Sequence, residues 1–182
     1  MAQTLHLTIA RSAGIRKALK ERYGKKLLHQ RCTIHKTRHI QRHLPKCWRK
    51  EAHRRFRIAL EQTSYAEAKA MLTALEGWLR ILNESAADSL REAFEELLAV
   101  HRLKVPALLR KTLHTTNPIE SRECERHIKR YRGSTMAQRW LAAVCLHCEH
   151  GFRTIKGFRE ITEVIRHIEA EHAAVQKEQV AA

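Results

Sequence analysis

Glu120 is an acidic residue in a position where it could do chemistry. It belongs to residues 115–121, TTNPIES, in which Pro118 at the first turn is typical of a helix start. The helix dipole favours a negative charge there, and a carboxylate held in its ionised form is a ligand for divalent metal ions. Taken alone, the segment fits an acid that only stabilises a helix end better than it fits a metal ligand.

Cys32 and His35 form a second candidate, a C-x-x-H pair. A structural zinc ion needs four ligands, and the other group of Cys and His residues, at 145–150, falls within one predicted helix. Because Cys145 and Cys148 share a face of that helix with apolar neighbours, we favour a packing role for them. For Cys32 and His35 we expect a role in shaping the wall of a site rather than zinc binding.

The elements that would position these residues begin with a strand. Residues 4–10 alternate apolar and polar side chains, which predicts a half-buried strand. Residues 15–23 predict a helix that ends at Gly24, and residues 26–32 predict a second short strand. A strand, a helix and a strand of this length predict a parallel pair, and a sheet of two strands is only marginally stable alone.

The rest of the chain is predicted to be helical, because apolar residues recur at helical spacing. The predicted helices cover residues 35–44, 48–60, 64–82, 86–100, 135–152 and 161–176, with a short apolar piece at 105–112. The expected fold class is therefore mostly α with a partial α/β start.

The charge of the chain points to a polyanionic partner. The 182 residues include 35 Lys and Arg against 19 acidic residues, which gives a formal net charge of +16. Basic residues occur in nearly every segment, and Trp48, Tyr131 and Trp140 lie among them. Nucleic acid is the commonest partner of so basic a surface. A basic domain without such a partner is the alternative.

The cysteines and the apolar segments indicate in which cellular compartment the protein is expected. Five cysteines, an odd and scattered set, do not resemble the disulfide framework of a secreted domain. The first residues show no basic region followed by a long apolar core, and no apolar run approaches the roughly 20 residues that span a bilayer. These features predict a cytoplasmic protein with no membrane partner.

Several segments, in order along nearly the whole chain, resemble the mutator-type insertion-sequence transposases. Residues 115–121 are similar to the family signature T-N-x-I-E-S, and residues 30–40, QRCTIHKTRHI, are similar to its Q-R-C-x-x-H-K stretch. Further similarities are GIRKAL at residues 14–19, LPK at 44–46, YRG at 131–133, RWLAA at 139–143 and FRTIKGF at 152–158. Each segment alone is weak, but the ordered set is specific.

This resemblance implies a fragment of an RNase H-like catalytic fold that carries an all-helical insertion. The corresponding segments are residues 1–44 for part of the α/β core, 45–112 for the insertion and 113–182 for the C-terminal helical part. The family uses two Asp and one Glu to hold two Mg²⁺ ions for DNA cleavage and strand transfer. Glu120 matches the Glu, and the matching motifs also contain the three residues Asn117, Cys32 and His35.

The two Asp of that triad have no counterpart in the sequence. Ala10 aligns with the second Asp, and the first is expected to precede residue 1. The chain contains one Asp, Asp88, inside a predicted helix of the middle segment. With Glu120 as the remaining ligand of an incomplete Mg²⁺ site, we expect a truncated DDE-type transposase that is inactive as this chain.

DNA contacts are expected from basic residues in two stretches of the chain. They are Arg31, Lys36, Arg38, Lys46, Arg49, Arg126, Lys129, Arg130, Arg132 and Arg139. The expected partners are DNA and either a second copy of the chain or the full-length transposase. The alternative is a non-catalytic, basic helical protein that binds nucleic acid or regulates the full-length enzyme. A nuclease with an unrelated metal site is disfavoured by the single Asp.

Overall fold

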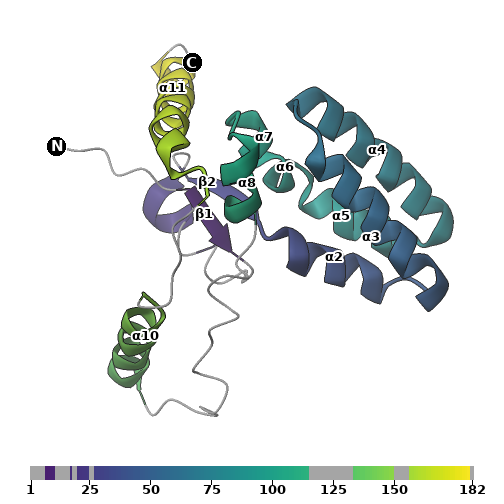
Figure 1. Cartoon of the computed structure of the whole chain (residues 1–182), viewed down its shortest axis with the longest axis horizontal. Helices are drawn as coiled ribbons and strands as arrows, with labels where there is room; N and C mark the ends of the chain where they lie inside the picture. Colours follow the sequence, from purple (N-terminus) through teal and green to yellow (C-terminus); the bar gives the residue numbers. More distant parts are fainter. Residues whose placement is uncertain are drawn as a thin grey trace. The chain divides into compact units, whose positions relative to one another are not determined.

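The computed structural model describes residues 7–10, 17, 20–24, 27–114, 133–149 and 156–180 (Figure 1). The chain forms two compact units, Met1–Thr115 together with Lys156–Ala182, and Thr116–Ile155. The described residues are mostly helical, which confirms the predicted fold class at that level. Within the described residues, no helix is both long enough and apolar enough to cross a bilayer.

A pair of short parallel strands begins the first unit. β1 (Leu7–Ala10) pairs with β2 (Leu28–Arg31), with Leu7 opposite Leu28 and Ala10 opposite Arg31. The parallel pairing predicted for residues 4–10 and 26–32 is confirmed over these shorter spans. Gly24, predicted to end the intervening helix, has a φ of 55°, in the left-handed region that glycine adopts without strain.

Four helices follow β2 and pack on one another. They are α2 (Thr33–Arg42), α3 (Lys46–Glu61), α4 (Tyr65–Leu82) and α5 (Glu84–Glu92). Figure 1 shows α3 and α4 side by side, with α5 against α4 and α2. Ser64 and Glu67 form a capping box at the start of α4, and the Asn83 side chain accepts a hydrogen bond from the Ala86 N–H at 3.0 Å.

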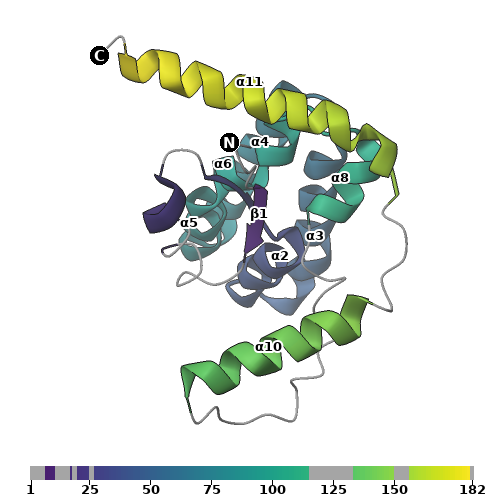
Figure 2. The ribbon, with the colours of Figure 1, turned by 90° about the vertical axis from the view of Figure 1, so that its left-hand side faces the viewer.

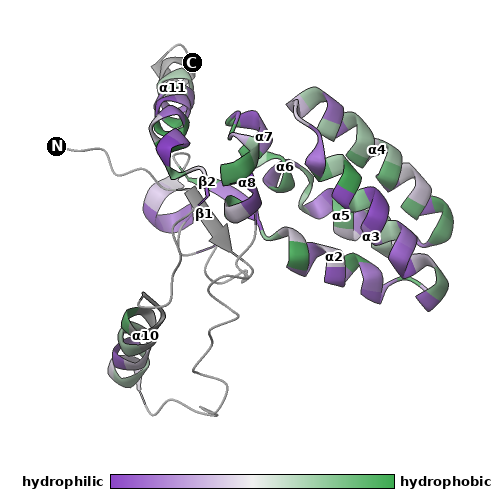
Figure 3. Ribbon diagram, in the orientation of Figure 1, coloured by the Kyte–Doolittle hydropathy of each residue, from purple (hydrophilic) through white to green (hydrophobic). Residues whose placement is uncertain are grey.

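Each of these helices buries one apolar face in a shared core. Its buried members include Phe56 on α3, Leu72 and Leu79 on α4 and Leu90 on α5. The hydropathy colours in Figure 3 show hydrophobic and hydrophilic residues along the same helices, as expected for helices with one buried face. No strand interrupts residues 50–110, which agrees with the predicted helical character of this segment.

The single helix predicted for residues 86–100 is wrong. The segment forms α5, then α6 (Phe94–Leu97), then α7 (Ala99–Arg102). Residues 97–100 are all at most 1% exposed. Four consecutive residues of one straight helix would point around most of its circumference, so breaks in the helix allow all of them to enter the core.

Gln30 of β2 completes the backbone hydrogen bonds at the second break. Its side-chain Oε1 accepts from the Val100 N–H at 3.1 Å, and its Nε2 donates to the Leu97 carbonyl oxygen at 3.3 Å. Gln30 is fully buried. The side chain therefore substitutes for backbone partners that the break between α6 and α7 removes.

The end of the first unit packs on β2 through a second core. α8 (Ala107–Leu113) and α11 (Ile161–Val180) contribute Leu109, Val164 and Ile168 to a cluster that includes Leu28 and Val100. A short 3-10 helix, η3 (Phe158–Glu160), precedes α11. Figure 2 shows α11 running beside α8.

Gly157 stands at the start of this end segment. It has a φ of 79°, and an added Cβ would lie 3.0 Å from the Leu109 backbone nitrogen. The space and the φ both require glycine at this position.

The second unit contains α10 (Ser134–Glu149), which overlaps the helix predicted for residues 135–152. Trp140 and Leu146 of α10 are exposed. The side chains of Cys145 and Cys148 lie outside the described residues, so the packing role predicted for them stays a prediction.

His101 should make the stability of the first unit depend on pH. Its Nε2 donates to the Leu60 carbonyl oxygen at 3.1 Å, and burial, followed by the charge of Arg110, lowers the pKa of His101 to about 4. The unfolded chain takes up this proton near pH 6.5. The contribution of His101 is therefore complete above that pH and is lost as the pH falls towards 4. We expect a decrease in the free energy of unfolding of about 2 kcal/mol from this group.

Urea unfolding measured between pH 7 and 4.5 tests this expectation. The variant His101→Gln has no titrating group at the position and should show a shallower decrease than the wild type. An equal decrease in both proteins would show that other groups cause the acid sensitivity.

Candidate functional site

The carboxyl ends of β1 and β2 form the candidate site. Ala10 ends β1 and lies opposite Arg31, which ends β2. Cys32 follows at once and is the residue before the first turn of α2. Ligands of parallel α/β structures bind at this edge, outside the carboxyl ends of the strands.

Cys32 and His35 contact each other at this edge. His35 Nδ1 lies 3.1 Å from Cys32 Sγ, and Cys32 is buried. Among the residues that the structure describes, no group of three or more His, Cys, Asp or Glu side chains could hold a metal ion. The role of the pair in shaping the wall of the site stays a prediction.

The basic residues nearest the strand ends are paired within the protein. Lys36 is 2% exposed, and its Nζ lies 2.8 Å from Glu92 Oε2. Arg31 contacts Glu92 Oε1 at 3.1 Å through Nη2 and Glu96 Oε2 at 3.4 Å through Nη1. These contacts join β2 and α2 to α5 and α6.

The chain returns to the same edge after the helical segment. The His114 carbonyl oxygen accepts hydrogen bonds from the Thr33 N–H at 3.0 Å and from Thr33 Oγ1 at 3.2 Å. His114 is therefore fixed at the first residue of α2, directly after Cys32. Five residues, 115–119, separate His114 from Glu120 in the sequence.

The sequence model of one protein family, described as "Transposase, Mutator family", matches residues 2–152. The chain belongs to the mutator family of transposases. No curated protein sequence and no solved structure matches the chain significantly. The match covers the strand pair, the whole helical segment and α10 of this mutator-family chain.

The other site residues predicted for the mutator-family chain are only partly described. Arg38 and Lys46 are exposed on α2 and α3, and Arg139 is exposed on α10. Arg49 is half-buried and donates from Nε to the Leu44 carbonyl oxygen at 2.9 Å. The remaining predicted site residues lie outside the described residues: Asn117, Glu120, Arg126, Lys129, Arg130 and Arg132.

Asp88, the one Asp of the sequence, lies on the exposed side of α5. Its Oδ1 is 3.2 Å from Arg80 Nη2 of α4. Asp88 therefore forms an ion pair between α5 and α4.

Glu92 and Glu96 were missed by the sequence analysis. Both are separated by more than fifty positions from the basic residues that they contact. One signal was available. The buried residues of α2 include Thr33, Lys36 and Ile40, which recur at helical spacing. A lysine on a buried stripe requires an acidic partner from another element.

Proposed function

We propose that this chain is a DNA-binding part of a DDE-type transposase that carries the Glu of the catalytic triad and cannot by itself cleave or join DNA. The observation that carries the proposal is Ala10. It occupies the carboxyl end of β1, beside β2, where the family resemblance places the second Asp. Alanine has no oxygen with which to bind a metal ion.

The fold supports an RNase H-like assignment for the part around the strands. A parallel strand pair is followed by helices from α2 to α8 before the chain returns to Thr33. This order fits an α/β core, residues 1–44, interrupted by a helical insertion, residues 45–112, and completed by residues 113–182. These boundaries stay part of the proposal.

Glu120 fits the position of the third acid by chain length. His114 is fixed beside Thr33, and a stretch of six residues reaches at most roughly 20 Å. The length of the chain therefore permits Glu120 to reach the strand ends, as the proposal requires. We expect the Cβ atoms of Ala10 and Glu120 to lie within roughly 10 Å, since the ligands of a two-metal site share ions about 4 Å apart.

The Mg²⁺ ions of the family do not fit the donor set that is described. Ala10 offers no ligand, and Asp88 is paired with Arg80 away from the strand ends. Within the described ranges, no three potential ligands converge. We therefore assign no metal-dependent step to this chain alone.

DNA binding is proposed for the exposed basic residues. Arg38, Lys46 and Arg139 are accessible, whereas Arg31 and Lys36 are assigned to the ion pairs with Glu92 and Glu96. Phosphate contacts from such residues give affinity without reading the sequence. A regulator of the full-length transposase that binds the same DNA is the alternative, because it would use the same exposed charges.

Restoring the acid at Ala10 tests the catalytic part of the proposal. Ala10→Asp should strengthen Mn²⁺ binding, because it adds a carboxylate near Glu120. Ala10→Asn, of the same shape and without charge, should not. Neither variant nor the wild type should transfer a DNA strand, because the other Asp is still missing. Mn²⁺ titration and a strand-transfer assay on the three proteins provide the measurements.

Two results would contradict this prediction. Strand transfer by the unmodified chain would show that it is a complete catalyst. Equal Mn²⁺ affinities in Ala10→Asp and Ala10→Asn would show that Ala10 does not occupy a ligand position.

A further inference from the structure

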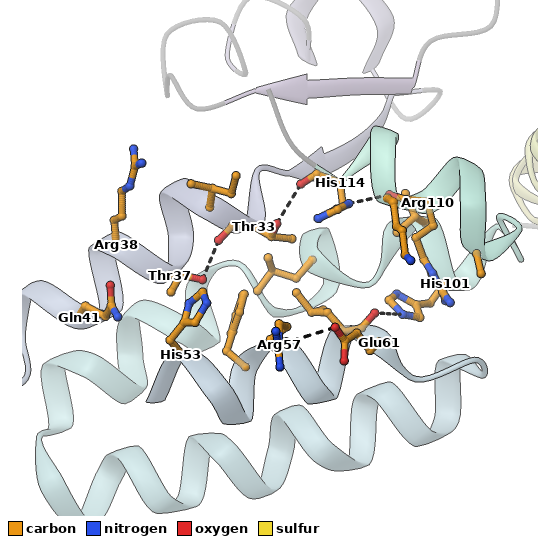
Figure 4. Close-up of a pocket in the computed structure, with 17 residues that line it drawn as sticks. Thr33, Thr37, Arg38, Gln41, His53, Arg57, Glu61, His101, Arg110 and His114 are labelled. Carbon is orange, nitrogen blue, oxygen red and sulfur yellow. Dashed lines mark hydrogen bonds and ion pairs between the residues drawn. The ribbon is translucent and has the colours of Figure 1, made fainter. Parts of the chain in front are cut away.

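A cavity of about 800 Å³ lies between α2, α3, α7 and α8 and is bordered by Thr33 and His114, which follow the strand ends (Figure 4). Its wall contains the apolar side chains Phe56, Leu60, Leu97 and Val100. This volume is within the range of small-molecule sites in proteins, roughly 300–1,000 Å³. The cavity is therefore large enough for an organic group with its own charged part.

Arg110 of α8 is the unusual residue of this wall. It is 9% exposed, and within the described part of the chain no carboxylate forms an ion pair with it. Burial lowers the pKa of Arg110, which reflects the cost of removing its charge from water. Lys36, the other buried cation discussed above, has Glu92 as its partner. A buried cation for which the described residues provide no acid is stabilised by an anion that binds beside it.

The charges around Arg110 favour an anion as well. Among the described residues, the cavity is also lined by Arg38, Arg57 and Lys111, and by one acid, Glu61. Glu61 Oε1 lies 3.6 Å from Arg57 Nε, so Glu61 offsets the charge of Arg57 and not the other positive charges of the wall. Figure 4 shows Arg110 and His101 at one end of the cavity, with Arg57 and Glu61 along α3.

We propose that this cavity holds one unstacked nucleotide of a DNA strand, with its phosphate on Arg110 and Lys111 and its base on the apolar wall. The inference rests on the proposed DNA binding. Arg38 is both an exposed residue of the proposed DNA-contacting surface and a residue of the cavity wall, so the two are continuous. A base and a phosphate together match the apolar and the cationic parts of the wall.

Binding to a duplex with one unpaired nucleotide tests the proposal, because an unpaired base leaves the stack at lower cost than a paired one. The full chain should bind this duplex at least about tenfold more tightly than the fully paired duplex. The same duplex with an abasic residue at the unpaired position should lose most of the preference. A free deoxynucleoside monophosphate should compete only weakly, since it lacks the flanking phosphates.

Arg110→Met should abolish the preference for the duplex with one unpaired nucleotide. It should change the affinity for the paired duplex by less than about threefold, since Arg110 is buried away from the outer surface. The matched control is Arg91→Gln. Arg91 lies on α5, is exposed and contacts Glu76 at 3.7 Å. This variant loses the same charge and should keep the preference.

A melting experiment does not depend on DNA. Arg110→Met should melt at a higher temperature than the wild type, because it removes a buried charge that has no acidic partner among the described residues. Inorganic phosphate, compared with chloride at equal ionic strength, should raise the melting temperature of the wild type more than that of the variant. An arginine with only a structural role would give the opposite change on substitution.

The outcomes separate the two proposals. A wild type that binds the paired duplex without preferring the unpaired nucleotide would overturn the nucleotide site and leave DNA binding intact. A wild type that binds neither duplex would overturn both. If Arg110→Met does not fold, the absence of a phosphate effect on the melting of the wild type would overturn the nucleotide site.

Discussion

Raising the salt concentration from about 50 to 200 mM is expected to weaken the binding of this chain to duplex DNA by on the order of a hundredfold or more. The formal net charge is +16, and exposed basic residues occur on α2, α3 and α10. Each phosphate that such a residue neutralises releases counterions, so the affinity falls steeply with salt. Fluorescence anisotropy with duplexes of unrelated sequence measures both the slope and the expected tolerance of sequence.

The structure provides a matched set of variants for this titration. Arg38→Gln and Lys46→Gln each remove an exposed charge. Each should lower the slope of log affinity against log salt concentration by about one per lost phosphate contact. Lys36→Met removes a charge that is buried and paired with Glu92, so it should leave the slope unchanged. A flat salt response of the wild type, or an equal effect of the three substitutions, would contradict a DNA-binding surface at the exposed positions.

Glu92→Gln is expected to lower the free energy of unfolding by about 2 kcal/mol or more. Glu92 is the acid shared by Lys36 and Arg31, at 2.8 and 3.1 Å. The substitution leaves the buried ammonium group of Lys36 without the Glu92 carboxylate. Losing the partner of a buried charge destabilises a protein far more than losing a surface ion pair. Urea unfolding at neutral pH provides the measurement.

Two controls distinguish this effect from the loss of an ordinary ion pair. Lys36→Met removes the buried charge itself and should cost less than Glu92→Gln, and the double substitution should recover part of the stability. Glu95→Gln removes an exposed acid that lies 3.3 Å from Lys69 and should cost under about 1 kcal/mol. The prediction is wrong if Glu92→Gln costs no more than Glu95→Gln.

Local patterns in the sequence were sufficient to predict much of the fold. The alternation in residues 4–10 and the break at Gly24 indicated the parallel pair, and the helical spacing of apolar residues in 64–82 indicated α4. These signals depend on residues close together in the chain, where backbone preferences and capping operate.

The features that the sequence analysis missed depend on distant residues. The breaks within residues 86–100 follow from the requirement to bury consecutive apolar side chains, and that requirement depends on which elements surround the segment. The ion pairs of Glu92 and the burial of Arg110 likewise join elements far apart in the sequence. Single-sequence periodicity contains no information on such partners, whereas tertiary packing determines them.

Gln30 has a consequence for the order of folding. The turn between α6 and α7 depends on a side chain that lies 67 to 70 positions earlier in the chain. Contacts of such long sequence separation form late, because the entropy of closing a long loop must be offset first. The helices from α3 to α5 can assemble from nearby contacts, but the Leu97–Val100 corner is complete only once β2 has docked. We therefore expect β2 to unfold together with the helical segment rather than before it.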